Sequence, residues 1–502
     1  MPRSGGYHPL RYWLPLLAGG LLLAGTTILL RTYSLTRYVD RSVDLGRIAG
    51  YERADAALFT VAIFLLFGGY MLMLFLTRKA ADTCPKPILL VLVLMTCMLL
   101  FGFAMIYPAT ASDVYLYIVR ARLWTEYGVD PSAVRPADVM LDDPFAHFMN
   151  WQWAVRVSPY GPLWNWIALP GAWISSSSML AAVLSFKVLA TSALLVSAGL
   201  VHQMIRPRGH HLATLATLAL ILNPLVLWEG IGNAHNDLIA LAPLLAALAC
   251  WQSRRSVWVI PLVTTSILLK YTAAPLLPLV AIALWRTTDP TARFSLALRS
   301  GLITLVVTVA SLAPFFHLEA LWQAIGEQRS IMVTSPALVA YLASEEWQWG
   351  ISKDALSTLS TVCVGLATLG GCATVWRNPA KLFASCYWVM LVLLLVGTPN
   401  LRPWYVVWLL PLALLAGSPG SWLPALVWSF TALWSYGYYI WIRDWWHVST
   451  WVFESTGVAS TLLPVIATQV AVSWRFRHPE PPIGRRLQGK VVSEATGYVS
   501  PR

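Results

Sequence analysis

Charged residues are scarce in this chain. Lys, Arg, Asp and Glu make up 12% of its 502 residues, whereas soluble globular proteins carry about twice that fraction. The apolar residues, 57% of the total, are gathered in long runs, many of them close to the roughly 20 residues that cross a bilayer core. These two features exclude a soluble globular domain and predict an all-α polytopic membrane protein.

Motifs of several common enzyme classes are also missing. The chain has no Walker A sequence and no GxGxxG after a strand, so a cradle for nucleotide phosphates is unsupported. It lacks HExxH, GxSxG and a clear Asp-x-Asp pattern that would hold a metal for a nucleotide sugar. The adjacent Asp142 and Asp143 are a weak substitute. We therefore expect no cofactor and no metal site.

Cysteines are few and unpatterned. The six cysteines (84, 97, 250, 363, 372 and 386) form no CxxC pair, and all but Cys84 lie within apolar runs. They are expected to be small buried hydrophobic residues rather than disulfide or metal ligands.

The apolar runs predict a bundle of roughly 12–14 transmembrane helices. Candidate spans lie near 12–30, 56–77, 88–106, 179–203, 212–228, 238–252, 257–270, 272–285, 297–316, 355–376, 382–397, 404–417, 421–441 and 457–474. The first run resembles a signal peptide, but it is long and no small-x-small cleavage site follows, so we expect an uncleaved span. The segment 162–174 is expected to lie at the surface. Residues 1–474 are thus one multispan domain, and 475–502 a basic, disordered cytoplasmic tail.

The net charge of +12 predicts orientation rather than nucleic-acid binding. With a cytoplasmic N-terminus, almost every short basic loop falls on the cytoplasmic side, as the positive-inside rule requires. Those residues are Arg78, Lys79, Lys86, Arg206, Arg208, Arg254, Arg255, Arg286, Arg293, Arg377 and Lys381. The main exception is the loop 31–55. We expect a plasma-membrane protein with both termini cytoplasmic and basic loops that meet anionic lipid headgroups.

The same orientation collects the polar segments on the outer face. They are 107–178, 229–237, 270–271, 317–354, 398–403 and 443–456. Within the first, 112–127 has helical spacing and is too charged to span, so it is expected to lie in the interface with Asp113, Tyr117, Arg120 and Trp124 on one face. One site at the outer surface is predicted.

Two outward carboxylates are candidates for chemistry. Asp113 could take a proton from an attacking hydroxyl, or it could cap a helix, a role that the neighbouring Ser112 would also fill. The sequence GNAHND places His235, Asn236 and Asp237 side by side at the end of a span. Asp237 could be a cap, but capping leaves the other two residues unexplained.

Cations and aromatic residues complete the candidate site. Lys270, between two short apolar runs typical of a broken helix, and Arg402 could bind a lipid phosphate or could snorkel at the interface. Lys187 lies well inside a span, which is costly without a partner. Tyr160 belongs to a tryptophan-rich turn, 150–166, whose rings could form a membrane belt or stack on sugars.

At these residues the chain resembles the polyprenol-phosphate-mannose-dependent α-1,6-mannopyranosyltransferases, within the GT-C glycosyltransferases. The similarity runs from about residue 100 to about 440. The resemblance is carried by the ordered segments SDVYLYIVRARLWTEYGVDP (112–131), SPYGPLW (158–164), NPLVLWEGIGNAHNDLIALAPLLAALA (223–249), LKYTAAPLLP (269–278) and LRPWYVVWLLPLALL (401–415). The sequence departs from the family pattern at Ala121, where a glycine is expected, and at Asp130–Ser132, where Asn-Pro-Tyr is usual.

The resemblance implies a GT-C-type fold with its active site at the outer leaflet. It implies a polyprenyl-phosphate sugar donor, a glycan or glycolipid acceptor and inversion at the anomeric carbon. Asp113 matches the family's catalytic base, and His235 and Asp237 match its His-Asn-Asp stretch. We expect His235, Asn236 and Asp237 to line a sugar pocket. Tyr117, Arg120 and Tyr160 are also expected to contact the substrate, and Lys270 and Arg402 the donor phosphate.

Two other classes of function stay open. A secondary transporter would use ionisable groups near the midplane, and Lys187 is the residue that best supports it. A polymerase or ligase would act on an oligosaccharide-linked lipid with the same outward site.

Overall fold

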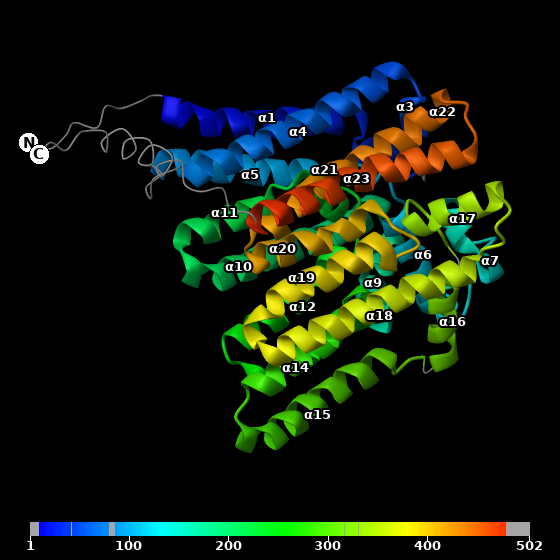
Figure 1. Ribbon diagram of the computed structural model, residues 1–502. Coiled ribbons are helices and arrows are strands. Elements are labelled where there is room, and N and C mark those ends of the chain that lie inside the picture. Colours follow the sequence, from blue (N-terminus) through cyan, green and yellow to red (C-terminus); the bar gives the residue numbers. More distant parts are fainter. Residues whose placement is uncertain (1–9, 42, 80–85, 316, 330, 478–502) are drawn as a thin grey trace, which may run out of the picture.

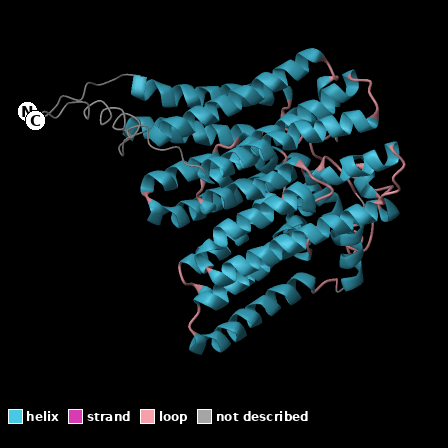
Figure 2. Cartoon of the chain, viewed as in Figure 1, coloured by secondary structure: helices cyan, strands magenta, loops and turns pink. Residues whose placement is uncertain are grey.

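The computed structural model describes residues 10–41, 43–79, 86–315, 317–329 and 331–477. Within these ranges the chain forms helices and no β-strand (Figures 1 and 2). The expected tail lies outside the described residues from 478 onward, and residues 475–477 extend the last helix. The five described cysteines are all free, as expected, but only Cys386 is buried. The expectation of burial is wrong for Cys97, which is exposed on α5 (Lys86–Ala104) because α5 contributes few of its side chains to the core.

Eight helices of the described chain are long and apolar enough to cross a membrane. Four of them are formed by α1 (Leu10–Thr32), α4 (Arg53–Lys79), α5 (Lys86–Ala104) and α18 (Lys353–Arg377), and a fifth by α23 (Thr450–Arg477). The other three are Met179–Arg208, which contains α10 (Met179–Ile205), Pro290–Leu312, which contains α15 (Arg293–Leu312), and Pro379–Gly397, which contains α19 (Leu382–Val392) and the π-helix η8 (Leu393–Gly397). The bent pair α11 (His210–Ile221) and η3 (Val226–Gly232) would make nine. The chain is therefore an all-α polytopic membrane protein, as predicted.

The number of long spans is below the 12–14 expected, because several apolar runs form shorter helices. Three of these are α12 (Asp237–Gln252), the segment Ser256–Leu269 that contains α13 (Val259–Leu269), and Pro403–Ala416. Each is shorter than the roughly 20 residues that cross a bilayer core. The segment 162–174, expected at the surface, forms the 14-residue helix α9 (Pro162–Ser175).

The polar segments gather at one end of the bundle. Figure 1 places α3 (Leu45–Ala49), α7 (Pro136–Val139), α17 (Pro336–Glu346) and α22 (Arg443–Trp445) at this end, called here the site end. The turns between α10 and α11 and between α14 (Leu277–Thr287) and α15 lie at the opposite end (Figure 1). The clustering expected from the loop charges is thus present in the fold.

The helix expected at 112–127 is α6 (Asp113–Thr125). A helix lying on a membrane surface would leave its polar face open, but ten of the thirteen residues of α6 are buried. They include Tyr117 and Arg120, because α9 packs against α6. The polar face predicted from the spacing therefore meets protein.

Three helices are interrupted at the site end. The π-helix η3 stops just before Asn233, Lys270 is extended between α13 and the 3-10 helix η5 (Tyr271–Leu276), and Arg402 is extended before the 3-10 helix η9 (Pro403–Trp408). Both η3 and α12 pack against η9. In membrane proteins such irregular backbone is tolerated where it is buried in protein or lines a cavity. The broken helix predicted at Lys270 is confirmed.

Candidate functional site

The loop that carries GNAHND has an unusual backbone conformation and is held by a buried lysine. Ala234 adopts φ 56°, in the left-handed region that non-glycine residues rarely occupy. Lys187, fully buried, donates from Nζ to the carbonyl oxygens of Ile106 (2.8 Å), Ile231 (3.0 Å) and Gly232. Lys187 therefore fixes the end of η3, and these three carbonyl oxygens give its buried amine hydrogen-bond partners.

His235 lies between two carboxylates. Its Nδ1 is 3.0 Å from Oδ2 of Asp113, and its Nε2 is 3.3 Å from Oε2 of Glu229. The side chains of His235 and Glu229 are 1% and 0% exposed, whereas that of Asp113 is 14% exposed. The imidazole ring stacks on Trp404, with 4.1 Å between ring centroids. We call Asp113, His235 and Glu229 the carboxylate–histidine row. Asp113 is its one partly exposed member.

The charges in this row support one another. Burial disfavours charge on His235, but contacts with Asp113 and Glu229 outweigh it and raise the pKa of the imidazole to about 9. Burial likewise opposes ionisation of Asp113, yet His235, Lys270 and Arg120 together lower the pKa of this carboxyl. At neutral pH the row holds an imidazolium beside an ionised Asp113.

Asp237 belongs to a second, separate cluster. Its Oδ2 accepts a 2.7 Å hydrogen bond from Lys270 Nζ, and its Oδ1 accepts one of the same length from Trp408 Nε1. Lys270 Nζ also donates to Asn236 Oδ1 (3.2 Å) and lies 5.0 Å from the Tyr405 ring centroid. The broken helices are therefore tied together by one buried ion pair.

Helix capping explains neither carboxylate. Ser112 is the N-cap of α6 and Asn236 that of α12, and neither side chain makes a capping hydrogen bond. Asp113 and Asp237 each begin a helix but direct their oxygens to His235 and Lys270. Both residues lie at a helix N-terminus, and the helix dipole there favours the ionised form of a carboxyl group.

The predicted substrate residues on α6 contact the His-Asn-Asp loop and the tryptophan-rich turn. The Tyr117 hydroxyl accepts a hydrogen bond from the backbone N–H of Asn236 (3.2 Å), and the Tyr117 ring packs edge-on to Tyr160. The Arg120 guanidinium donates to the carbonyl oxygens of Trp153 (3.3 Å) and Val157 (3.4 Å). These contacts join α6 to the His-Asn-Asp loop and to the tryptophan-rich turn.

Arg402 lies at the edge of the same region. Its Nε donates to Asn400 Oδ1 (2.9 Å), and its guanidinium lies 5.8 Å from the Trp404 ring centroid. The side chain lines a pocket together with Thr334, Ser435 and Thr461. Burial lowers the pKa of this guanidinium, and Tyr405 and Asp113 oppose that effect. Arg402 is thus within electrostatic reach of Asp113.

The sequence reasoning missed several members of the site. Glu229 was hidden because it follows an apolar run and precedes the more conspicuous GNAHND. Asn233 Nδ2 donates to Glu229 Oε2 (2.9 Å) and to Thr110 Oγ1 (2.7 Å). The sequence did contain a signal for Glu229, because an ionisable residue at the end of an apolar run is in itself a candidate functional residue. Among the described residues no cluster fit to hold a metal is found.

Comparisons with known proteins show the family to which the chain belongs. Residues 17–286, more than half of the chain, match the family described as "Alpha-(1->6)-mannopyranosyltransferase, N-terminal domain". The chain is 27% identical over 334 residues to Alpha-(1->6)-mannopyranosyltransferase A of Mycobacterium tuberculosis, a match that covers 62% of this chain and 61% of the relative.

Two relatives from Corynebacterium glutamicum match shorter parts. Alpha-(1->6)-mannopyranosyltransferase A is 25% identical over 177 residues, covering 34% of each chain. Alpha-(1->6)-mannopyranosyltransferase B is 30% identical over 142 residues, covering 28% of this chain and 23% of the relative. Each match therefore spans less than two thirds of the relative, and no solved structure matches the chain significantly. By the extent of the family match, the chain belongs to the α-(1→6)-mannopyranosyltransferase family.

Proposed function

We propose that this protein is a membrane mannosyltransferase that moves a mannosyl group from a polyprenyl-phosphate donor to a glycan or glycolipid acceptor. Transfer takes place at the outer face of the plasma membrane with inversion at the anomeric carbon. The observation that carries the proposal is the contact of His235 with both Asp113 and Glu229. This row offers an ionised, partly exposed carboxylate with a fixed orientation, which glycosyl transfer to a hydroxyl requires.

In the proposed reaction, Asp113 is the general base. The acceptor oxygen forms a bond to C1 of the sugar, the bond between C1 and the phosphate oxygen breaks, and the hydroxyl proton passes to the Asp113 carboxylate. The polyprenyl phosphate leaves with the bonding electron pair. A carboxylate of lowered pKa is a weak base, so it takes the proton late, when the hydroxyl has become acidic through bond formation to C1.

His235 and Glu229 act behind Asp113. The imidazolium keeps Asp113 ionised and turned toward the open side, and Glu229 stabilises the imidazolium from the buried side. Asn236 and Asp237 shape the sugar site next to His235. Tyr117, Arg120 and Tyr160 hold the outer loop over it through the contacts described above.

The donor phosphate is assigned to Arg402, with help from Lys270. Arg402 lines a pocket and is close enough to Asp113 for their charges to interact. A guanidinium binds phosphate through strong, charge-assisted hydrogen bonds. Lys270 is partly neutralised by Asp237, so its contribution is expected to be the smaller one.

Purified protein should be incubated with polyprenyl-phosphate mannose and mannose-containing acceptors, and the products weighed by mass spectrometry. A gain of one hexose supports the proposal. Transfer of several sugars at once from an oligosaccharide-linked lipid would support the polymerase or ligase alternative instead. Uptake of a labelled sugar or ion into proteoliposomes, independent of any lipid-linked donor, would support the transporter alternative. The bonds from Lys187 to three backbone carbonyls favour a structural role for that residue.

A further inference from the structure

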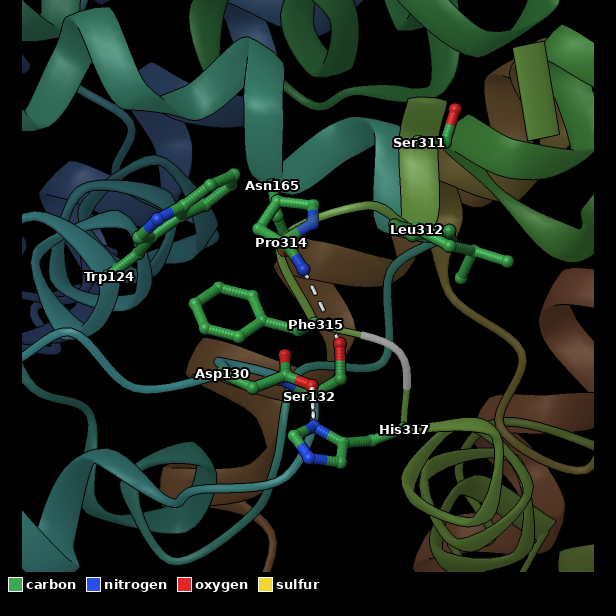
Figure 3. Close-up of a pocket in the computed structure, with 10 residues that line it drawn as sticks. Trp124, Asp130, Ser132, Asn165, Ser311, Leu312, Pro314, Phe315 and His317 are labelled. Atoms are coloured by element: carbon green, nitrogen blue, oxygen red, sulfur yellow. Dashed lines mark hydrogen bonds and ion pairs between the residues drawn. The ribbon is translucent and has the colours of Figure 1, made fainter. Parts of the chain in front are cut away.

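A second polar pocket lies by Trp124, at the C-terminal end of α6, whereas Asp113 begins that helix. Figure 3 shows the residues that line this pocket. Trp124 near the end of α6, Asp130 and Ser132 in the following loop, Asn165 on α9, and Phe315 and His317 after α15 all line it. We call it the distal pocket. The mechanism above uses none of these residues.

The distal pocket has a fixed polar floor. Asp130 Oδ1 accepts a hydrogen bond from the Ser132 backbone N–H (2.8 Å), and Asn165 Nδ2 donates to Ser132 Oγ (3.4 Å). Asp130 Oδ2 lies 3.1 Å from His317 Nδ1, and their side chains are 5% and 59% exposed. A buried carboxylate thus holds an imidazole whose side chain is largely exposed. Figure 3 shows the contact between the two groups.

The wall of the distal pocket is aromatic. The Trp124 ring meets Phe315 edge-on, with 5.1 Å between ring centroids. It meets Trp166 in the same way at 4.7 Å. Aromatic walls with a few placed polar groups are typical of small-molecule sites. Carboxylate, amide and imidazole groups beside aromatic rings suit a sugar, because its hydroxyls need hydrogen bonds and its C–H faces pack on rings.

The position of the distal pocket suits a polymeric ligand. Asp113 and Trp124 are eleven residues apart on α6, so they share one helix face and lie about 16 Å apart along it. Several linked pyranose rings, and not one, cover such a distance.

We propose that the distal pocket is a subsite for a neutral pyranose of the acceptor glycan, several sugar units away from the hydroxyl that reacts at Asp113. The inference rests on the proposed glycosyl transfer. It makes Asp130 and His317 residues that select long acceptors. His317, held in place by the buried Asp130, binds a sugar of the acceptor glycan, and neither residue takes part in the bond changes.

The test is a series of linear α-(1→6)-linked mannooligosaccharides of increasing length, used as acceptors with the full-length protein. In the wild type, kcat/KM should rise once the chain is long enough to reach the distal pocket. His317→Ala and Asp130→Asn should remove this gain. We expect kcat/KM for the long acceptors to fall by about tenfold, the effect of losing one hydrogen bond to a charged group. Both should leave the shortest extended acceptor unaffected. His447→Ala, an exposed histidine at the same end, is the control.

Each outcome decides the proposal. An unchanged length dependence in both variants overturns it, as does an equal loss for short and long acceptors. His317 is largely exposed, so its replacement tests binding without burying a new group. If the wild type extends no acceptor, the proposed function fails. Saturation-transfer NMR with the longest oligosaccharide then tests whether the distal pocket binds a sugar. The subsite proposal stands only if the oligosaccharide gives a saturation-transfer signal with the wild type and none with His317→Ala.

Discussion

The Nζ atom of Lys270 lies 2.7 Å from Oδ2 of Asp237, and both side chains are nearly buried. The pair joins the start of α12 to the break between α13 and η5. Because Asp237 also accepts a hydrogen bond from Trp408, it holds three interrupted segments together.

Replacing Asp237 by Asn should therefore weaken the fold more than the chemistry. Loss of one partner from a buried ion pair costs roughly 3–5 kcal/mol. We expect Asp237→Asn to lower the melting temperature in detergent and to raise the donor KM, with kcat affected far less. A normal melting temperature with a large loss of kcat would instead make Asp237 the base.

Replacing Asp113 by Asn should stop turnover without stopping binding. The amide keeps the shape of the side chain but cannot accept the hydroxyl proton, and general-base catalysis contributes about 10²–10⁴-fold. We expect kcat to fall by at least the lower value, while donor affinity measured by calorimetry is kept. Asp138→Asn, at an exposed position of the same loop region, is the matched control. Near-normal turnover in Asp113→Asn would remove the assignment.

Arg402→Ala should weaken donor binding. A lost hydrogen bond to a charged group is worth roughly 1.5–3 kcal/mol, so the donor KM should rise by at least about tenfold. Lys270→Ala should have a smaller effect on binding and a larger one on stability, because it leaves Asp237 without its cation. Arg443→Ala, an exposed arginine at the site end, should change neither. The phosphate assignment fails if donor kinetics are unchanged in both Arg402→Ala and Lys270→Ala.

The site end should face outward. Single cysteines introduced at Asp138 and Gln348, in a background without native cysteines, should react with an impermeant maleimide added to intact cells. A cysteine at Arg206, in the turn at the opposite end, should react only after the membrane is opened. Labelling of the last position in intact cells would reverse the orientation.

The sequence allowed the membrane class and the clustering of polar loops to be predicted, because long apolar runs and the placement of basic residues are local patterns. It also placed Asp113 and His235 at one site, although 122 positions separate them in the chain. The hydrogen-bond and ion-pair partners of the buried polar residues could not be predicted from the sequence. Nothing in the spacing indicates that Lys270 pairs with Asp237, or that Lys187 binds the carbonyls of η3, since those contacts depend on how short helices break and pack.

The last prediction concerns pH. The pKa of His235 is raised from 6.5 to about 9 in the folded protein. The stabilisation from its charged form is therefore fully present below the ordinary pKa and is lost as pH rises through about 9. Stability and kcat/KM should both decline over this alkaline range, because Asp113 then loses the imidazolium that orients it. Melting temperature and initial rates measured from pH 6 to pH 10 check this.

Two variants separate His235 from the other groups that titrate in this range. Glu229→Gln removes one of the two carboxylates beside the imidazole, so the alkaline decline should move to lower pH by roughly 1–3 units. His447→Gln, at an exposed histidine, should leave the profile unchanged. An alkaline decline that stays in place in Glu229→Gln would show that Glu229 has no part in setting the charge of His235. Because Glu229 is fully buried and would not meet substrate, a shift of the profile without a matching change in donor KM distinguishes positioning of His235 from a direct binding role.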